Sequence, residues 1–274
     1  MRVDFTKMHG VGNDFAIFEA AEVRSRLTPE RVRALADRRT GIGFDQALLL
    51  GAPHRPGSAA SYRIFNRDGD EVEQCGNGAR CIAALLFGRR GGERIALDSP
   101  AGTVRARPGA PGQVAIDMGP PNFEPRALPF DAPAARDPHL LEVGGQMLRI
   151  GIVALGNPHA VLEVADVDSA PVATLGPLIE HHPRFPRRVN VGFLQIVDEG
   201  HARLRVHERG AGETPACGTG ACAAVVIGQR RGQLAPRVRV SVPGGELQVD
   251  WAGEPTSVWL TGPAEVSFEG HVEV

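Results

Sequence analysis

Short apolar runs, several of them alternating with polar residues, cover most of the chain and are interrupted by two longer runs of small and branched apolar residues. The alternating segments, such as 237–242 (RVRVSV), predict β-strands with one buried face. The two longer runs follow Cys75 and Cys217 and predict buried helices. A third helix is predicted to begin at Pro29, because Thr28 is a good N-cap residue and proline is favoured in the first helical turn.

The remaining elements follow in the same order twice. Strands are predicted in the first half at residues 1–7, 15–20, 41–51, 59–65, 94–98, 103–107 and 113–118. The second half gives a short helix near 171–180 and strands at 147–155, 160–164, 189–197, 201–210, 237–242, 246–250 and 257–262. The proline-rich segment 119–138 is interpreted as a connection, and the basic run 181–188 is expected to be a solvated loop.

The two helix-starting segments belong to an internal repeat. Asn66 precedes Cys75 by nine positions, and Glu208 precedes Cys217 by nine. A Gly-Asn pair also stands before each cysteine, at distances of 62 and 60 positions. Self-similarity at a lag of about half the chain indicates two copies of one structural unit.

Residues 1–119 are expected to form the first unit and residues 120–262 the second. The tail 263–274 begins with the same Gly-Pro step that opens the second unit, so it has the form of a strand that starts a third copy. We expect this strand to return and complete the sheet of the first unit, which would tie the two halves together.

Charge and length exclude several classes of protein. The 274 residues carry 30 basic and 32 acidic side chains, a net charge of −2, so neither a nucleic-acid nor a membrane partner is expected. No apolar run reaches the roughly 18–20 residues of a membrane-spanning helix, and the N-terminus lacks the apolar core of a signal peptide. Four cysteines in a chain this long predict reduced thiols, in keeping with a cytoplasmic location.

The sequence lacks the binding motifs of the common cofactors. Lys7 is the only lysine and lies in a predicted strand, which argues against a Schiff base with pyridoxal phosphate. No Gly-Lys-Ser/Thr phosphate loop is present, and residues 10–15 (GVGNDF) lack the third glycine of a dinucleotide-binding fingerprint. The common cofactors therefore have no recognisable binding site in this sequence.

A zinc site built from the four cysteines is a different class of hypothesis, and spacing argues against it. Five residues separate Cys75 from Cys81 and four separate Cys217 from Cys222, where zinc knuckles have two. Cys81 and Cys222 are expected only to pack inside their helices. No metal is predicted.

Cys75 and Cys217 each stand at the predicted start of a buried helix. Unpaired backbone N–H groups and the positive end of the helix dipole favour a thiolate over a thiol there, and also bind carboxylates. Duplication about a local dyad can let two such thiols face one carbon from opposite sides. One thiolate then removes a proton from one face while the opposite thiol protonates the other, which inverts a stereocentre.

The neighbouring residues suit an amino-acid substrate. Backbone N–H groups after Gly76 and Gly218 can take the two oxygens of its carboxylate, and can stabilise the charge that develops as the α-proton leaves. Glu208 can hold the ammonium group, and His159 can exchange a proton with one of the thiols.

The runs GNDF, FNRDGDEVEQCGNGARC, GNPH and ERGAGETPACGTG resemble those of the diaminopimelate epimerase family, in the same order and spacing over essentially the whole chain. The resemblance implies an α+β fold of two pseudo-symmetric units, each a barrel-like mixed β-sheet wrapped around a central α-helix, with the active site in the cleft between them. It also implies a cofactor-independent isomerase of lysine and peptidoglycan biosynthesis that interconverts LL- and meso-2,6-diaminopimelate, and it suggests a homodimer.

Matching the family's motifs residue by residue assigns the site. Cys75 and Cys217 become the acid–base pair, and His159 and Glu208 tune and orient it. The groups assigned to the reacting carboxylate are Gly76, Asn77, Gly218 and Thr219. The residues assigned to line the substrate are Asn13, Gln46, Asn66, Asn157, Asn190 and Arg209, of which the arginine suits the distal carboxylate by its two-pronged guanidinium. Segments 122–139 and 181–188 match no motif with an assigned role.

Proline racemase and hydroxyproline epimerase share the two-cysteine chemistry, so they remain the alternative within enzymes. Arg209 and the asparagines assigned to the substrate favour a second charged amino-acid end over a proline ring. Two thiols that share one carbon are nearly close enough to bond, so oxidation is expected to join Cys75 to Cys217 in an inactivating, reducible disulfide.

Overall fold

The computed structural model describes residues 2–19, 23, 27–72, 75–132, 134 and 136–273. A few positions of the sequence analysis lie outside this range. They are the strand-end residues Met1, Ala20 and Val274, two residues of the motif before Cys75, Glu73 and Gln74, and two residues of the connection 119–138, Pro133 and Ala135.

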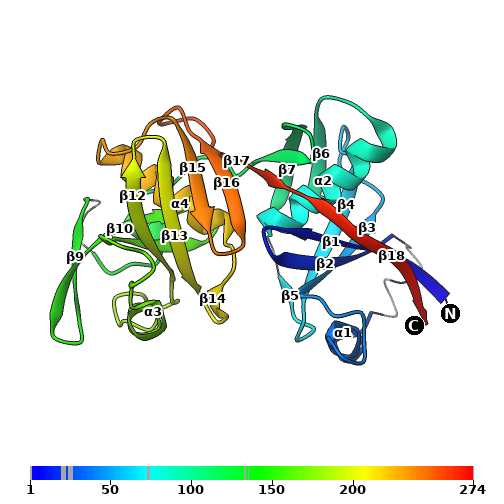
Figure 1. Ribbon diagram of the computed structural model, residues 1–274, viewed down its shortest axis with the longest axis horizontal. Coiled ribbons are helices and arrows are strands. Elements are labelled where there is room, and N and C mark those ends of the chain that lie inside the picture. The colour runs from blue at the N-terminus through cyan, green and yellow to red at the C-terminus, as the bar shows by residue number, and fades with distance from the viewer. Residues whose placement is uncertain are drawn as a thin grey trace. The chain divides into compact units, whose positions relative to one another are not determined.

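The chain divides into two compact units, Met1–Asp117 with Thr261–Val274 and Met118–Leu260. The last strand, β18 (Glu265–Glu273), pairs antiparallel with the first, β1 (Arg2–Gly10), and the two run side by side in red and dark blue in Figure 1. The end of the chain thus supplies a strand to the sheet in which the chain begins.

Both units contain a mixed sheet built in the same order. The other elements of the first unit are β2 (Asn13–Phe18), α1 (Pro29–Ala36), β3 (Gln46–Gly51), β4 (Ala60–Asn66), β5 (Glu71–Val72), α2 (Gly76–Arg90), β6 (Ile95–Ser99), β7 (Gly102–Pro108) and β8 (Gln113–Asp117). β1 pairs antiparallel with β2, β2 parallel with β3, β3 antiparallel with β4, and β4 parallel with β6.

The elements after β8 are a 3-10 turn (Pro125–Ala127), β9 (His139–Val143), β10 (Gln146–Ala154), β11 (Pro158–Glu163), α3 (Val172–Glu180), β12 (Asn190–Asp198), β13 (His201–Glu208), β14 (Gly212–Thr214), α4 (Gly218–Arg230), β15 (Arg237–Val242), β16 (Gly245–Asp250) and β17 (Trp259–Pro263). The pairings of the first unit recur: β10 antiparallel with β11, β11 parallel with β12, β12 antiparallel with β13, and β13 parallel with β15. The predicted α+β fold with two similar units is confirmed.

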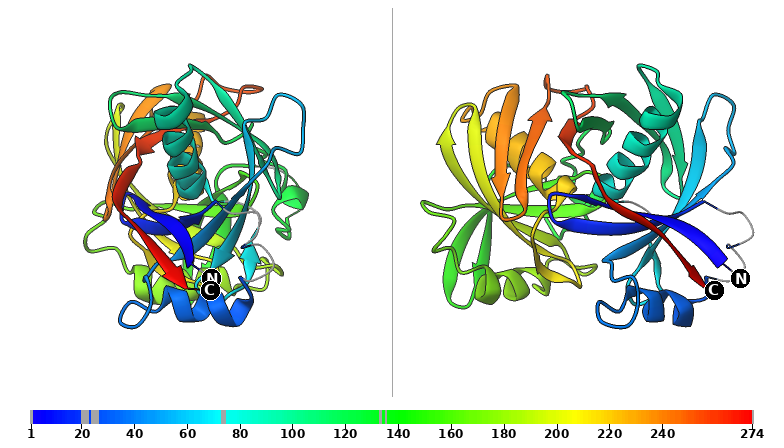
Figure 2. Two further views of the ribbon diagram at one scale, coloured as in Figure 1. Left: turned by 90° about the vertical axis from the view of Figure 1, so that its right-hand side faces the viewer. Right: turned by 45° about the vertical axis from the view of Figure 1, so that its right-hand side comes forward.

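One long helix lies against several strands of each sheet. α2 packs against β1, β2, β6, β7 and β8, and α4 packs against β10, β11, β12, β13 and β16. Figure 2 shows each helix enclosed by the strands of its own unit. Most residues of α4 are buried, from Gly218 to Gly228, which explains why its sequence is apolar on all sides.

The second half of β10 is buried on both faces. Ile150 and Ile152 of β10 belong to a core cluster that includes Ile179 of α3, whereas a Cβ on Gly151 between them would meet Ile227 of α4 at 2.5 Å. Alternate residues of one strand therefore pack against different helices. This is why β10 contains a continuous apolar run.

The short helix α1 begins as the sequence predicted. The Thr28 side chain accepts a hydrogen bond from the Arg31 N–H at 3.3 Å, with proline in the first turn. Its buried residues are Val32, Leu35 and Ala36, one apolar face packed on the sheet of the first unit.

Three strands were missed by the sequence analysis. β5 and β14 are two and three residues long, too short for a periodic pattern. β9 alternates buried and exposed residues over His139–Val143, but this short pattern follows a proline-rich connection and does not by itself predict a strand. It pairs with β10 as β18 pairs with β1, so it fills in the second unit the position that the chain end fills in the first.

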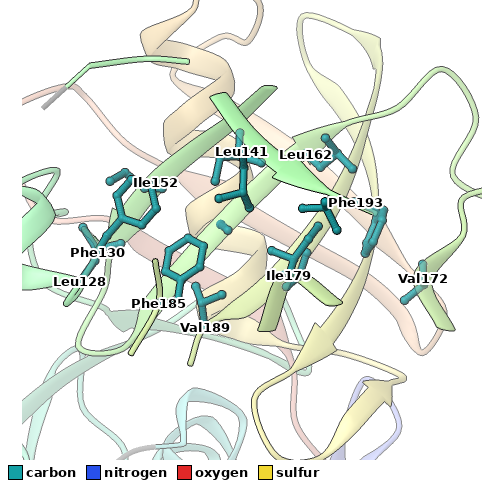
Figure 3. Packing of buried hydrophobic residues seen from close by; sticks show 14 of the residues in the cluster. Leu128, Phe130, Leu141, Ile152, Leu162, Val172, Ile179, Phe185, Val189 and Phe193 are labelled. Carbon is teal, nitrogen blue, oxygen red and sulfur yellow. The ribbon is translucent and has the colours of Figure 1, made fainter. Parts of the chain in front are cut away.

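The expectation of a solvated loop at 181–188 is wrong for its centre. Phe185 is 2% exposed and stacks on Phe130 with ring centroids 4.6 Å apart. Figure 3 shows both rings within the apolar cluster of the second unit, together with Leu141 and Ile179. The guanidinium of Arg184 lies over the Phe130 ring, 4.3 Å from its centroid. Within this basic run, Phe185 therefore belongs to the apolar core and Arg184 covers the core at its edge.

Candidate active site

Cys75 caps the helix α2 with its own sulfur. It is the N-cap residue, with an extended backbone, and its Sγ accepts a hydrogen bond from the Gly78 N–H at 3.4 Å. A cysteine here takes the place that serine or aspartate usually fills. The thiol is thereby held at the N-terminal end of a buried helix, where the helix dipole is positive.

The residues assigned to the first unit gather around this helix start. The Asn13 Oδ1 accepts a hydrogen bond from the Asn77 Nδ2 at 3.3 Å and lies 3.9 Å from the Cys75 Sγ. On the neighbouring strands, the Gln46 Nε2 donates to the Asn66 Oδ1 at 2.8 Å. Gly76, the first residue of α2, follows the cysteine directly.

Cys217 stands at the equivalent place before α4 and is buried. Its Sγ lies 3.5 Å from the Thr219 Oγ1, which also accepts a hydrogen bond from the Asn157 Nδ2 at 3.3 Å. The Asn157 Oδ1 lies 2.9 Å from the His159 Nε2. Close packing explains the glycine at 220, because a Cβ there would lie 2.9 Å from Val206 and 3.3 Å from the Cys217 sulfur.

The remaining assigned residues of the second unit form a second group. The Asn190 Nδ2 donates to the carbonyl of Pro158 at 2.9 Å, and its Oδ1 accepts the Arg209 backbone N–H at 2.9 Å. The Glu208 carboxylate accepts a hydrogen bond from the Thr214 hydroxyl at 2.5 Å. The Arg209 side chain is exposed, with Nη1 3.3 Å from the carbonyl of Arg187.

Strand register gives the assigned residues equivalent positions in the two units. In the first unit Gln46 pairs with Phe15, the second residue after Asn13. In the second, Asn190 pairs with His159, the second residue after Asn157. The assigned polar residues therefore occupy corresponding positions in the two sheets. Asn190 thus has in the second unit the place that Gln46 has in the first.

The expected preference for a thiolate is not found at Cys217. Burial raises the pKa of this thiol well above its usual value, and the negative charge of Glu208 and a hydrogen bond with that carboxylate raise it further. Thr219 acts in the opposite direction but is outweighed. Cys217 therefore stands in this structure as a thiol, and the favourable effect of the helix start does not overcome desolvation.

His159 is held neutral. Burial lowers its pKa to about 3, and the positive charge of Arg209 contributes in the same direction. Its Nε2 faces Asn157, and its Nδ1 has no hydrogen-bond partner among the residues that the structure describes. The described contacts connect His159 to Cys217 only through Asn157 and Thr219, so the direct proton exchange expected between them stays a prediction.

Several residues that the sequence analysis missed hold the assigned ones in place. In the first unit, Asp45 accepts a hydrogen bond from Asn13 and is paired with Arg38. In the second, Glu180 accepts the backbone N–H of Gly210, immediately after the Glu208–Arg209 turn. Their acidic side chains were visible in the sequence, but their partners lie about 30 positions away and gave no local signal.

Neither a metal cluster nor a membrane helix is evident in the described parts of the chain. No three His, Cys, Asp or Glu side chains among those residues converge as a metal-binding group. Likewise, none of the described helices is long and apolar enough to span a membrane.

Solved structures with a similar fold come from several enzymes. The chain superposes on a hydroxyproline epimerase from Agrobacterium vitis with a TM-score of 0.69 and 17% identity, over 99% of this chain and 92% of that one. It superposes on a PhzF-family phenazine biosynthesis protein from Bacillus anthracis with a TM-score of 0.70 and 15% identity, over the full length of both. The fold is thus the two-unit fold found in these epimerase and PhzF-type proteins.

Within that class, the chain belongs to the diaminopimelate epimerase family. Residues 5–124 and 151–267 match the family described as diaminopimelate epimerase. The chain is 51% identical to the diaminopimelate epimerase of Azotobacter vinelandii (strain DJ / ATCC BAA-1303), over 100% of both chains. It is 54% identical to that of Laribacter hongkongensis (strain HLHK9), over 99% of both. The resemblance stated from the motifs and the prediction of an isomerase are confirmed.

Proposed function

We propose that this chain interconverts LL- and meso-2,6-diaminopimelate by proton transfer at one α-carbon, using Cys75 and Cys217 as acid and base. The observation that carries the proposal is the pair of equivalent helix starts, each with a cysteine. Cys75 lies beside Asn13 of the first Gly-Asn loop. Cys217 lies beside Thr219, which accepts a hydrogen bond from Asn157 of the second Gly-Asn loop. Two homologous thiols in one chain match a reaction that needs one group on each face of a carbon. The full-length identity to diaminopimelate epimerases of about half the residues favours this substrate.

The proton balance is simple. The thiolate of one cysteine takes the α-proton and becomes a thiol, and the C–H electron pair passes into the carboxylate as a carbanion forms. The thiol of the other cysteine gives its proton to the opposite face and becomes the thiolate. In the reverse direction the two cysteines exchange roles, so the enzyme needs no external acid or base.

The neighbouring groups stabilise the charge that develops. Backbone N–H groups at Gly76–Asn77 and Gly218–Thr219, at the first turns of α2 and α4, bind the reacting carboxylate as it gains charge. Glu208 holds the α-ammonium group, whose charge acidifies the carbon. The exposed guanidinium of Arg209 binds the distal carboxylate.

The test is proton exchange in D2O with LL-diaminopimelate, comparing the parent protein with Cys75→Ala and Cys217→Ala. We expect the parent to incorporate deuterium at one α-carbon as the meso isomer forms, and both variants to lose epimerisation. A dispensable cysteine contradicts the two-base mechanism. If the protein turns over proline or hydroxyproline but not diaminopimelate, the proposed substrate is wrong and the alternative, a proline racemase or hydroxyproline epimerase activity, takes its place.

Three further expectations go with this function. Oxidation joins Cys75 to Cys217 in a reducible disulfide that abolishes activity, which peptide mapping of the oxidised protein checks. The enzyme works in the cytoplasm, where its thiols stay reduced. It forms a homodimer, which sedimentation equilibrium of the purified chain measures directly.

A further inference from the structure

A chain of charged groups lies behind Asn13 in the first unit. Arg38 donates to both oxygens of Asp14, at 2.9 and 2.8 Å, and to the Asp45 Oδ1 at 2.9 Å. Lys7, the only lysine, donates to Asp14 at 2.6 Å. The Asp45 Oδ2 then accepts hydrogen bonds from the Asn13 Nδ2 at 3.0 Å and from the Asp14 N–H at 3.2 Å.

The chemistry of these groups fixes the direction of every hydrogen bond. A guanidinium can only donate, and an ionised carboxylate can only accept. Burial alone would raise the pKa of Asp14, but hydrogen bonds from Arg38 and Lys7 outweigh it and hold that pKa at about 2. Because Asp45 must accept, the atom that Asn13 presents to it has to be the amide nitrogen.

The opposite end of the same amide faces the thiol. With Nδ2 bound to Asp45, the Asn13 Oδ1 is turned toward the Cys75 Sγ at 3.9 Å and the Asn77 Nδ2 at 3.3 Å. A carbonyl oxygen accepts a hydrogen bond from S–H but repels a thiolate. The Gly78 N–H at 3.4 Å does the reverse, so the sulfur has one partner suited to each protonation state.

We propose that Asp45 is a positioning residue for Cys75. By accepting a hydrogen bond from the Asn13 amide nitrogen, it keeps the amide oxygen toward the sulfur and so favours the protonated thiol. This inference deepens the proposed function, on which its relevance to catalysis rests, because a thiol ready to donate is one of the two states that the reaction requires.

The titratable neighbours of Cys75 do not compete for this role. Among the described residues, Tyr62 on β4 and Cys81 on α2 are coupled to it by charge. Burial raises the pKa of Tyr62 above its usual range, and it raises the pKa of Cys81 to about 12. Both groups stay neutral at the pH of the assay, so neither adds a charge beside the Cys75 sulfur.

The test is the pH dependence of Cys75 alkylation by iodoacetamide, followed for the Cys75 peptide by mass spectrometry in the full chain. In Asp45→Ala the Asn13 amide loses its anchor and can turn its N–H toward the sulfur. We expect the midpoint of alkylation to move down by roughly half a pH unit or more. An unchanged midpoint in the folded variant overturns the proposal.

A double-mutant cycle separates this effect from simple loss of a negative charge. Asn13→Ala removes the carbonyl and should also lower the midpoint, and Asp45→Ala should add nothing further in that background. A second shift of the same size in the double variant means that Asp45 acts through space, and overturns the proposal. If Asp45→Ala fails to fold, an unchanged midpoint in Asn13→Ala has the same consequence.

Two control variants complete the design. Arg38→Ala breaks the ion pairs but leaves Asp45 as acceptor, so it should not lower the midpoint, and an equal lowering would overturn the proposal. The second control, Asp98→Asn, replaces another buried carboxylate of the first unit by a neutral amide. It weakens the hydrogen bonds that Asp98 accepts from the backbone N–H groups of His54 and Arg55. It should lower the melting temperature without moving the midpoint, and a shift in it as large as that in Asp45→Ala would overturn the proposal. Alkylation needs no substrate, so the midpoint can be measured whether or not the parent protein is an epimerase. A failure of the proposed function can therefore be told apart from a failure of this inference.

Discussion

The His207 Nε2 lies 2.8 Å from the Glu180 Oε2, in a pair buried inside the second unit. The other oxygen of Glu180 accepts the backbone N–H of Gly210 at 2.9 Å. Burial alone would raise the pKa of Glu180, but the hydrogen bonds from His207 and Gly210 outweigh it and lower that pKa. The C-terminal residue of α3 thus anchors, as a carboxylate, the turn that carries Glu208 and Arg209.

Replacing this anchor tests its contribution to both stability and binding. Glu180→Gln keeps the shape but gives Gly210 and His207 a neutral partner, and we expect a loss of about 1–3 kcal/mol in the free energy of unfolding at pH 7. KM for diaminopimelate should rise more than kcat falls, because the turn and not the thiol is disturbed. Glu163→Gln, on a more exposed carboxylate, is the control and should change little.

The sign of the pH dependence follows from the lowered pKa of Glu180. The carboxylate contributes its stability above the unfolded value, near 4.5, and loses it as the pH falls through the folded value below that. The difference in unfolding free energy between parent and Glu180→Gln should therefore shrink on acidification below pH 4.5. A constant difference down to pH 3 would contradict the ionised anchor.

After burial, Glu208 is the main cause of the raised pKa of the Cys217 thiol. Since its charge and its hydrogen bond contribute to the raised pKa of that thiol, Glu208→Gln should lower the Cys217 pKa. Modification of the Cys217 peptide by iodoacetamide at pH 9 should become faster, while epimerisation falls by about 100-fold or more because the ammonium loses its anion. Glu213→Gln, whose carboxylate binds Arg205 instead, should alter neither rate. Slower modification in Glu208→Gln would show that Glu208 does not act on the thiol.

A buried histidine limits stability in acid. His139 is 0% exposed, lies edge-on to Phe130, and has no hydrogen-bond partner at either ring nitrogen within the described part of the chain. Burial lowers its pKa, and the positive charges of Arg136 and Arg184 lower it further. The folded state therefore prefers the neutral ring, so stability is complete above the unfolded pKa of 6.5 and is lost as the pH falls below it.

Removing the polar ring should reduce this loss. We expect His139→Leu to stabilise the protein by about 1 kcal/mol near neutral pH, because it removes an unsatisfied buried group, and by more at pH 5. Thermal unfolding of both proteins between pH 5 and 8 measures the effect. His54→Leu, at an exposed position, is the matched control, and equal changes in the two variants would rule out burial as the cause.

Two helical glycines should respond to alanine with opposite signs. A Cβ on Gly176 of α3 would lie 2.6–2.8 Å from ring and Cβ atoms of the buried His207, so Gly176→Ala should destabilise by about 1–3 kcal/mol. A Cβ on Gly88 of α2 would meet nothing within 4 Å, so Gly88→Ala should stabilise by about 0.5–1 kcal/mol through its better helix propensity. Melting temperatures that move the same way would contradict this packing.

Local signals made much of the fold predictable. The cap at Thr28–Pro29 and the helix after Cys217 depend on residues within a few positions, and both elements are found where they were expected. The helix after Cys75 runs to Arg90 and ends where its C-cap residue, Gly91, has a positive φ of 63°. Strand β9 escaped detection because its alternation is short and follows a proline-rich segment.

The sequence by itself determined the repeat, the α+β class and the two helix starts, because these follow from periodicity, capping and the spacing of motifs. Only the tertiary structure decided that Asp45 fixes the Asn13 amide, that Glu180 anchors Gly210, and that Cys217 is a buried thiol. Each of these depends on side chains brought together from distant positions. Desolvation and hydrogen bonding at such contacts are set by the folded surroundings, which no local pattern encodes.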